Sequence, residues 1–181
     1  GDKTASKTLN RATDTTRQPG STFKILAAYS AALDAGGLTL ASVQDDAPYT
    51  YAGANGKSVN NYDRRYRGFT TLREAITDSI NIVTVKTLAQ AGVSLGWQYV
   101  QEYGFTTVDS RDMNEALALG GITQGVSNLE LTAAYAAIAN QGTYIKPKFY
   151  TKILDHDGNV LIDNTTPESH TVIKDTTAWL L

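Results

Sequence analysis

The sequence predicts a single globular domain that is mostly helical and carries one β-hairpin near its C-terminal end. The chain has 181 residues and a mass of 19.5 kDa, which is the size of one domain. With 41% hydrophobic and 19% charged residues, it can bury a sizeable core. Apolar residues recur at helical spacing after residue 22, whereas an Asp-Gly pair at 157–158 separates two β-rich runs.

Composition excludes several classes of function. The formal net charge is -2 and the pI is about 5.6, so the chain lacks the basic surface expected of a nucleic-acid partner. There is no cysteine, which excludes disulfides, thiolate metal sites and cysteine nucleophiles. The longest nearly apolar stretch, residues 25–33, is much shorter than the ~20 residues that cross a bilayer.

The first third of the chain predicts one buried helix between two irregular segments. Residues 1–20 are polar and end in Pro-Gly, which indicates an N-terminal loop. From residue 21 to residue 33, apolar side chains occupy all faces of the predicted helix, so we expect it to be buried. Gly36 and Gly37 end that helix. Residues 38–68 have no sustained periodicity and are expected to form a long ordered loop.

The next segment predicts a helix that is interrupted. Thr71 followed by Glu74 is typical of a capping box at a helix start, and an amphipathic run continues towards Gly92. β-Branched residues crowd positions 80–85 and lower the helix propensity there. We therefore expect two short helices with a turn near residues 78–81.

The remainder predicts further helices and a hairpin. We expect helices at residues 94–103 and 128–140, strands at 148–154 and 159–162, and the start of an apolar helix at 177–181. Ser127 and Glu130 have the spacing of a second capping box. Asp157 and Gly158 provide the turn between the strands.

The two histidines are poor candidates for catalysis. His156 lies at the predicted hairpin tip, and His170 lies in the polar segment 165–171. Loops of this kind are ordinarily solvated, so both imidazoles are expected to face water. A catalytic nucleophile and its base must therefore come from other residue types.

Ser21 and Lys24 form the strongest candidate pair. Side chains three apart on a helix lie on one face, so an amine at position 24 can reach the hydroxyl at position 21. Burial lowers the pKa of a lysine and allows it to act as a base. The alternative is an ordinary N-cap beside a solvated charge. Ten serines and nine lysines in 181 residues predict about 0.5 chance occurrences of Ser-x-x-Lys, so the motif alone does not decide.

A second candidate element is Ser-Ile-Asn at residues 79–81. It falls on the expected turn between two helices, where a hydroxyl and an amide can project into a cleft. Ser-Val-Asn at residues 58–60 has the same spacing. The Gly- and Asn-rich surroundings at 53–56 favour an exposed loop for Ser58, whereas Ser79 and Asn81 lie in a mostly apolar segment. We therefore prefer the motif at 79–81.

Longer strings resemble the transpeptidase domain of class A bifunctional penicillin-binding proteins. The matching strings are Arg-Gln-Pro-Gly-Ser-Thr-Phe-Lys at 17–24, Asn-Asn-Tyr-Asp-Arg-Arg-Tyr-Arg-Gly at 60–68, Thr-Leu-Arg-Glu-Ala at 71–75, Ser-Ile-Asn at 79–81, Leu-Gly-Gly at 119–121 and Gly-Val-Ser at 125–127. They follow the family's order and rough spacing, and the resemblance covers nearly the whole chain.

The resemblance implies an α+β fold, like that of the penicillin-binding transpeptidases and serine β-lactamases. The chain would supply mostly the helical subdomain, plus a β-hairpin of a truncated antiparallel sheet. It also implies a serine D,D-transpeptidase that cross-links peptidoglycan stem peptides through an acyl-enzyme and is a target of β-lactams. In that scheme Ser21 is the nucleophile and Lys24 is its base. Ser79 relays protons, while Asn81 holds Lys24 and binds the substrate amide.

The chain departs from the family pattern at three places. Ile25 and Asn128 stand where the family has proline, and no Lys-Thr-Gly or Lys-Ser-Gly triplet is present. We therefore expect residues 1–181 to be a partial transpeptidase domain whose two ends are missing, and the isolated piece to react poorly with β-lactams. The missing part of the domain is a further partner if it is supplied by a separate chain.

The resemblance implies neither a metal nor an organic cofactor, and no nucleic-acid partner. It places the full-length protein outside the cytoplasm, with a membrane anchor. Two alternatives stay open at this point. A serine β-lactamase would hydrolyse its acylated β-lactam, although no carboxylate loop for activating water is identified. The other alternative is a catalytically incomplete fragment that acts as a binding or structural module.

Overall fold

The segment that follows Pro19 forms the centre of the fold. The computed structural model describes residues 8–52 and 56–181. A 3₁₀ turn at Gly20–Thr22 leads into a π-helical turn at Ile25–Tyr29 and then into α1 (Ser30–Asp34). The predicted buried helix is confirmed as a buried helical segment, but it contains three kinds of turn. Its wide middle turn closes where the Ser30 N–H donates to the carbonyl of Ile25.

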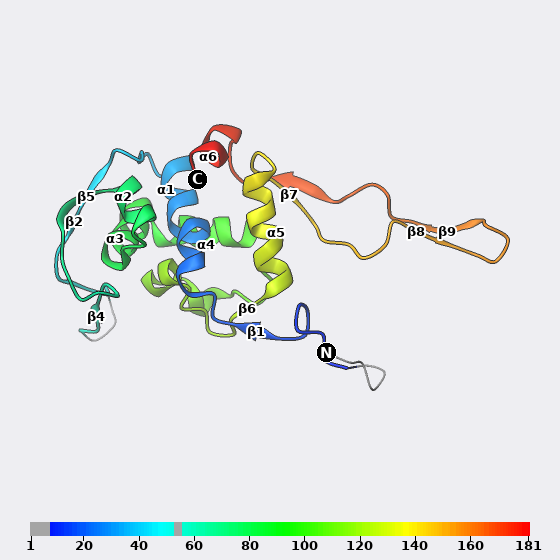
Figure 1. Ribbon diagram of the computed structural model, residues 1–181, viewed down its shortest axis with the longest axis horizontal. Coiled ribbons are helices and arrows are strands. Elements are labelled where there is room, and N and C mark those ends of the chain that lie inside the picture. The colour runs from blue at the N-terminus through cyan, green and yellow to red at the C-terminus, as the bar shows by residue number, and fades with distance from the viewer. Residues whose placement is uncertain (1–7, 53–55) are drawn as a thin grey trace.

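Longer helices surround this central segment (Figure 1). They are α2 (Leu72–Thr77), α3 (Asn81–Ala91), α4 (Val93–Glu102), α5 (Asn128–Ala139) and α6 (Asp175–Leu180), with 3₁₀ helices at Ser110–Asp112 and Glu115–Leu119. Gly96 lets α4 approach the central segment closely, because a Cβ there would lie 2.5 Å from the carbonyl oxygen of Ala27. Phe23, Leu26 and Tyr29 are fully buried in this packing.

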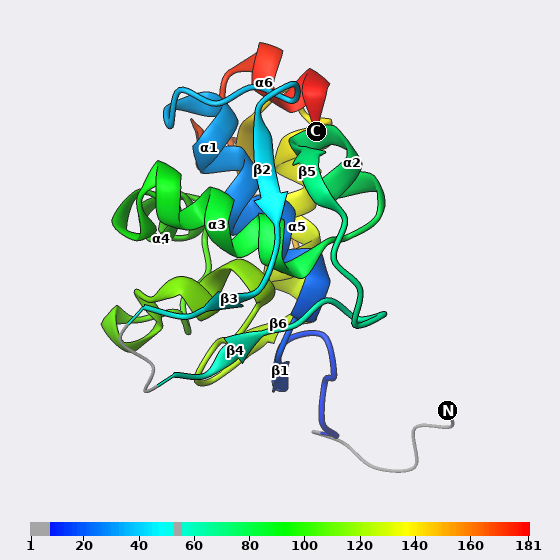
Figure 2. The same cartoon turned by 90° about the vertical axis from the view of Figure 1, so that its left-hand side faces the viewer.

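Short antiparallel pairs make up the β structure of the described residues. They are β1 (Thr16–Arg17) with β6 (Val126–Ser127), β2 (Val43–Asp46) with β5 (Gly68–Thr71), β3 (Tyr49–Thr50) with β4 (Ser58–Val59), β7 (Thr143–Ile145) with β10 (Ser169–Thr171), and β8 (Lys152–Leu154) with β9 (Val160–Asp163). Figure 2 shows β2 and β5 running side by side along the helical body. The β8–β9 hairpin extends away from that body (Figure 1).

Local sequence patterns explain most element boundaries. The expected break separates α2 from α3, and both predicted capping boxes are present, at Thr71 with Glu74 and at Ser127 with Glu130. Each box satisfies backbone N–H groups that a helix start leaves free. The hairpin at Asp157 and Gly158 is also confirmed, although its first strand begins at Lys152 rather than at residue 148.

The prediction of a long loop at residues 38–68 is wrong. This segment contains β2, β3 and β4, and it ends at the start of β5. The strands are two to four residues long, which is too short to give a clear alternating pattern. The predicted N-terminal loop likewise contains β1. Residues 1–7 of that loop, and residues 53–55 of the Gly- and Asn-rich stretch, lie outside the described part.

Candidate active site

Lys24 is a buried cation at the centre of the candidate site. Its residue exposure is only 3%, and it follows the turn that carries Ser21. Burial lowers the pKa of the Lys24 ammonium from 10.5 to about 8, because the charged form loses hydration. At pH 7 about a tenth of the side chains are therefore uncharged amine, which can accept a proton, and this fraction rises with pH.

Three oxygen atoms hold the amine of Lys24 in place. Nζ donates to the Ser79 carbonyl oxygen at 2.5 Å, to the Ser79 hydroxyl at 2.9 Å and to Oδ1 of Asn81 at 2.6 Å. These partners lie 55 and 57 residues further along the chain. The structure therefore joins Lys24 with both polar side chains of the Ser-Ile-Asn motif.

An unusual turn presents those two side chains to the lysine. Ser79 adopts a left-handed conformation with φ of 53°, which is costly for a residue with a side chain. It stands between the end of α2 and Ile80, which precedes the first residue of α3. In this conformation, both the carbonyl and the hydroxyl of Ser79 reach Lys24. Strain of this kind often marks a functional position.

Ser21 lies at the surface beside this buried corner. It is exposed and belongs to the 3₁₀ turn Gly20–Thr22, so its hydroxyl is open to an incoming molecule. Among the described residues, Lys24 donates to Ser79 and Asn81, and no hydrogen bond joins it to Ser21. Gly120 packs on this turn, since a Cβ there would lie 2.6 Å from the Gly20 nitrogen.

The chain matches a known family over its full length. Residues 1–181 match the family model described as penicillin binding protein transpeptidase domain. Penicillin-binding protein 1F of Bacillus subtilis is 40% identical over 174 residues, which cover 96% of this chain and 23% of that protein. The chain belongs to the penicillin-binding protein transpeptidase family. Its relatives include class A members such as this 1F protein and the 1A protein of Neisseria flavescens, which is 41% identical over 160 residues, 86% of this chain and 19% of that protein.

Solved structures show the same fold. Penicillin-binding protein 1A of Haemophilus influenzae is 33% identical, with a TM-score of 0.76 over 90% of this chain and 24% of that one. Penicillin-binding protein A of Mycobacterium tuberculosis, solved as an imipenem acyl-enzyme complex, reaches a TM-score of 0.80 at 21% identity, over 94% of this chain and 43% of that one. The fold is therefore the α+β fold of penicillin-binding transpeptidase domains. The chain spans about a quarter or less of the length of the curated relatives named here.

The sequence alone assigns no role to the residues that support the Ser79–Asn81 turn. The carbonyl of Asn60 accepts a hydrogen bond from Nδ2 of Asn81 at 2.7 Å. Asn61 is buried and accepts from the first backbone N–H groups of α3. Both belong to the string at 60–68 that carries the family resemblance. Their contacts lie about 20 residues away, so no local periodicity could reveal them.

The prediction for the competing Ser-x-Asn motif at residues 58–60 is confirmed only in part. Ser58 is exposed, but it lies in strand β4 rather than in a loop. The next residue, Val59, is 2% exposed and belongs to the hydrophobic core. The alternation of a strand explains both facts, because neighbouring side chains point to opposite faces. The motif approaches the candidate site only through the backbone carbonyl of Asn60.

The histidines take no part in the hydrogen bonds that hold Lys24. His156 is exposed at the hairpin tip, as predicted. His170 is exposed as predicted, but it lies in strand β10 rather than in a loop. A hydrogen bond of 2.8 Å joins its Nε2 atom to the carbonyl of Glu102, and its ring lies 5.3 Å from that of Tyr144. Pairing with β7 explains this placement.

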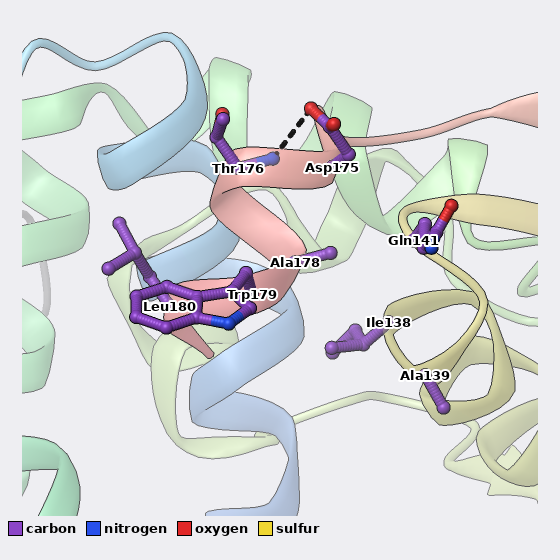
Figure 3. Close-up of a pocket in the computed structure, with 8 residues that line it drawn as sticks. All are labelled: Ile138, Ala139, Gln141, Asp175, Thr176, Ala178, Trp179 and Leu180. Atoms are coloured by element: carbon purple, nitrogen blue, oxygen red, sulfur yellow. Dashed lines mark hydrogen bonds between the residues drawn. The ribbon is translucent and has the colours of Figure 1, made fainter.

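A pocket away from these residues carries little chemistry. Its volume is about 660 Å³, and it lies between α5 and α6 (Figure 3). Its lining is mostly apolar, and Asp175 is its one ionisable side chain. Figure 3 shows Trp179 and Leu180 of α6 and Ile138 of α5 along this groove. The groove contains no pairing of nucleophile and base like that of Ser21 and Lys24.

Neither a bilayer-spanning helix nor a metal cluster is found in the part of the chain described by the structure. The helices within residues 8–52 and 56–181 are too short or too polar to cross a bilayer. Over the same ranges, acidic residues and histidines do not gather in groups of three or more that could hold a metal ion.

Proposed function

We propose that this chain provides the nucleophile and base of a serine D,D-transpeptidase that cross-links peptidoglycan stem peptides. One observation carries the proposal: in a member of the penicillin-binding transpeptidase family, an exposed serine lies three residues before a buried lysine that is held by Ser79 and Asn81. Residues 1–181 would then form part of a transpeptidase domain. The substrate would be a stem peptide that ends in D-alanyl-D-alanine.

The first half of the reaction acylates Ser21. The neutral amine of Lys24 takes the proton from Oγ of Ser21, and the oxygen attacks the carbonyl carbon of the penultimate D-alanine. The peptide C–N bond then breaks. Ser79 donates its hydroxyl proton to the departing amine of the terminal D-alanine and regains a proton from the Lys24 ammonium. The 2.9 Å contact between Lys24 and Ser79 supports this relay.

The second half transfers the acyl group. An amine of a neighbouring stem peptide attacks the ester carbonyl, and its proton returns through the same groups to Oγ of Ser21 as the ester C–O bond breaks. Asn81 keeps Lys24 in place through Oδ1. Its Nδ2 group has a second hydrogen besides the one donated to Asn60, and this hydrogen is available to the substrate carbonyl.

Ser21 and Lys24 need not be hydrogen-bonded before substrate arrives. Catalytic hydrogen bonds are often long in the free enzyme and tighten in the complex. Three acceptors position the amine of Lys24, and the proposal requires the exposed Ser21 hydroxyl to come within hydrogen-bond reach of it in the complex. β-Lactams are proposed to acylate Ser21 as well, since they present a similar and strained carbonyl. The imipenem acyl-enzyme of the Mycobacterium tuberculosis protein, which shares this fold, supports the extension.

The proposal also implies where the protein acts and what it binds. A transpeptidase acting on stem peptides works outside the cytoplasm, and we propose that the natural protein is held at the membrane by a segment outside this sequence. Stem peptides and β-lactams are its proposed partners. Neither a metal nor an organic cofactor is needed, because the nucleophile, base and proton relay are all side chains.

The proposal is tested with a fluorescent penicillin and the natural protein that contains this chain. We expect covalent labelling of the peptide containing Ser21, and complete loss of labelling in Ser21→Ala. Thr22→Ser is the matched control, since it keeps a hydroxyl next to Ser21 and should still label at Ser21. Labelling of Ser21→Ala at the wild-type rate would contradict the proposal. An adduct that is hydrolysed within minutes rather than persisting for hours would instead indicate a β-lactamase.

A further inference from the structure

A buried carboxylate lies beneath the Ser79–Asn81 turn and has no part in the proposed chemistry. Asp46, the last residue of β2, is fully buried. Its oxygens accept from Nδ2 of Asn61 at 2.8 and 3.0 Å and from the backbone N–H of Arg67 at 3.0 Å. The Arg67 guanidinium lies 3.7 Å away. A buried carboxylate is costly unless it is paired and hydrogen-bonded, and these contacts meet both conditions for Asp46.

Asn61 links this carboxylate to helix α3. Its Oδ1 atom accepts from the backbone N–H of Asn81 at 3.0 Å and from that of Ile82 at 3.1 Å. A helix start leaves such N–H groups without partners, and a side chain at the N-cap usually satisfies them. Here the N-cap is Ile80, which makes no capping hydrogen bond with its side chain. Asn61 therefore caps α3 from a distant part of the chain.

Asp46 determines which end of the Asn61 amide faces the helix. An ionised carboxylate only accepts hydrogen bonds, so it requires the NH₂ group of Asn61 on its side. The carbonyl oxygen of that amide is then directed at α3. The Arg65 carbonyl reinforces the orientation by accepting from the same Nδ2 atom at 2.8 Å. A reversed amide would place Nδ2 against two backbone donors and Oδ1 against the carboxylate.

The neighbouring residue fixes the Asn81 amide in the same way. Nδ2 of Asn81 donates to the Asn60 carbonyl, so Oδ1 is left to face Lys24 at 2.6 Å. Two consecutive residues, Asn60 and Asn61, thus hold both the side chain and the backbone N–H of Asn81. All of these atoms lie in one connected chain of hydrogen bonds from Asp46 to Lys24.

We propose that Asn61, oriented by Asp46, is a positioning residue that fixes the start of α3 and thereby holds Oδ1 of Asn81 against Nζ of Lys24 during acylation. This inference rests on the proposed function for its effect on rate. Its structural part, the capping of α3 by an amide that a buried carboxylate orients, is measured without any substrate. Asp46 and Asn61 touch no reacting atom, and they act through Asn81.

The test is a double-mutant cycle that exchanges the two side chains. Asn61→Asp places two carboxylates in contact, and we expect fluorescent-penicillin acylation to fall by about 10²-fold, the size of effect that a small misplacement of catalytic groups produces. Asp46→Asn alone removes the orienting charge and should lower the rate about 3- to 10-fold. The double variant restores one carboxylate facing one amide, so it should recover part of the rate lost in Asn61→Asp, although the Arg65 carbonyl still loses its donor.

Asp112→Asn is the matched control for rescue. Asp112 is 1% exposed and accepts from the backbone N–H and hydroxyl of Thr123, so it is a buried carboxylate of similar environment. Combining Asp112→Asn with Asn61→Asp should not restore the acylation rate. If Asn61→Asp does not fold, the double variant decides: a folded double variant with at most a tenfold loss of rate supports the proposal, and a folded one with a hundredfold loss overturns it.

Hydrogen exchange separates this inference from the proposed function. In the substrate-free protein, the Asn81 and Ile82 amides should exchange faster in Asn61→Asp and regain protection in the double variant. Wild-type protein that is never labelled at Ser21 would refute the proposed function, while the exchange pattern would still decide whether Asn61 caps α3. Unchanged exchange and unchanged acylation in all three variants would overturn the inference.

Discussion

Two regions of the molecule are stabilised in opposite ways. One is the site formed by Lys24, Ser79 and Asn81, here called the Lys24 corner, and the other is the β8–β9 hairpin. In the corner, a buried amine reaches partners 55 and 57 residues away, and a strained residue, Ser79, is held between two helices. In the hairpin, every residue of β8 and β9 is exposed, and the strands pair only with each other. The corner depends on the whole fold, whereas the hairpin depends on its own turn.

This difference determines what a substitution should do in each region. A change in the corner leaves buried polar groups without partners and displaces groups proposed to act in catalysis, so it should affect reaction rate strongly. A change in the hairpin should remain local, because few contacts transmit it. The apolar side chains of the hairpin do not alter this expectation, since they are exposed; they include Ile153, Leu154, Val160, Leu161 and Ile162.

The largest effect should come from Lys24→Met, which keeps much of the side-chain volume but removes the base. We expect β-lactam acylation to fall by about 10² to 10⁴-fold, the usual contribution of a general base. In the wild type, acylation should rise with pH through about 8, where Lys24 becomes neutral. Stopped-flow acylation from pH 6 to 10 measures both. A wild-type profile without that rise would contradict the role of Lys24 as the base.

The same residue should also affect stability in a pH-dependent way. Its pKa is about 8 in the folded chain against 10.5 when unperturbed, so the unfolded state binds more protons between these values. The free energy of unfolding of the wild type should therefore increase with pH across this window, relative to that of Lys24→Met. Urea titrations at pH 7.5 and 10.5 test the direction, and a relative decrease would argue against a buried lysine with a lowered pKa.

An intermediate effect is expected from the capping box that starts α5. Ser127→Ala removes the hydroxyl that accepts from the backbone N–H of Glu130, and it should cost about 1 kcal/mol in the free energy of unfolding. Thr71→Ala, at the other capping box, is the matched comparison. Urea unfolding gives both values. A change below about 0.3 kcal/mol in both variants would show that tertiary packing alone holds these helix starts.

Local chemistry explains which parts of the fold the sequence predicts. The capping boxes, the turn between α2 and α3, and the hairpin each depend on residues within four positions of one another. Sequence reasoning also selects Ser79 and Asn81 correctly as the pair that contacts Lys24. Their catalytic roles, like that of Ser21, stay predictions until acylation is measured.

Long-range pairing explains what the sequence does not predict. Asp46 and Asn61 are 15 residues apart, and they lie in a segment whose strands are so short that its pattern predicts a loop. The polar sequence around His170 predicts its exposure to solvent but not its strand, because its pairing with Tyr144 depends on strand β7. In each case the partner that defines the environment is distant in sequence, so no periodic pattern marks the residue.

A small and local effect should follow from a change at the hairpin turn. Gly158 has φ of 86°, and a Cβ there would meet nothing within 4 Å, so Gly158→Ala introduces backbone strain of about 1 kcal/mol without a clash. Amide exchange should accelerate within residues 152–163. Acylation and the midpoint of global unfolding should not change. A fall in either would show that the hairpin is coupled to the corner.

The smallest effect should come from Ser58→Ala, which tests whether the corner uses side chains selectively. Ser58 is exposed, and its neighbour Asn60 reaches Asn81 only through a backbone carbonyl that this substitution preserves. Acylation by fluorescent penicillin should therefore equal that of the wild type, whereas Ser79→Ala should lower it by about 10² to 10⁴-fold through loss of the proton relay. The two variants change the same residue type at the same motif spacing, so a difference between their acylation rates is caused by the position of each serine in the fold. Equal losses in the two variants would mean that the hydroxyl of β4, and not that of the strained turn, serves the reaction.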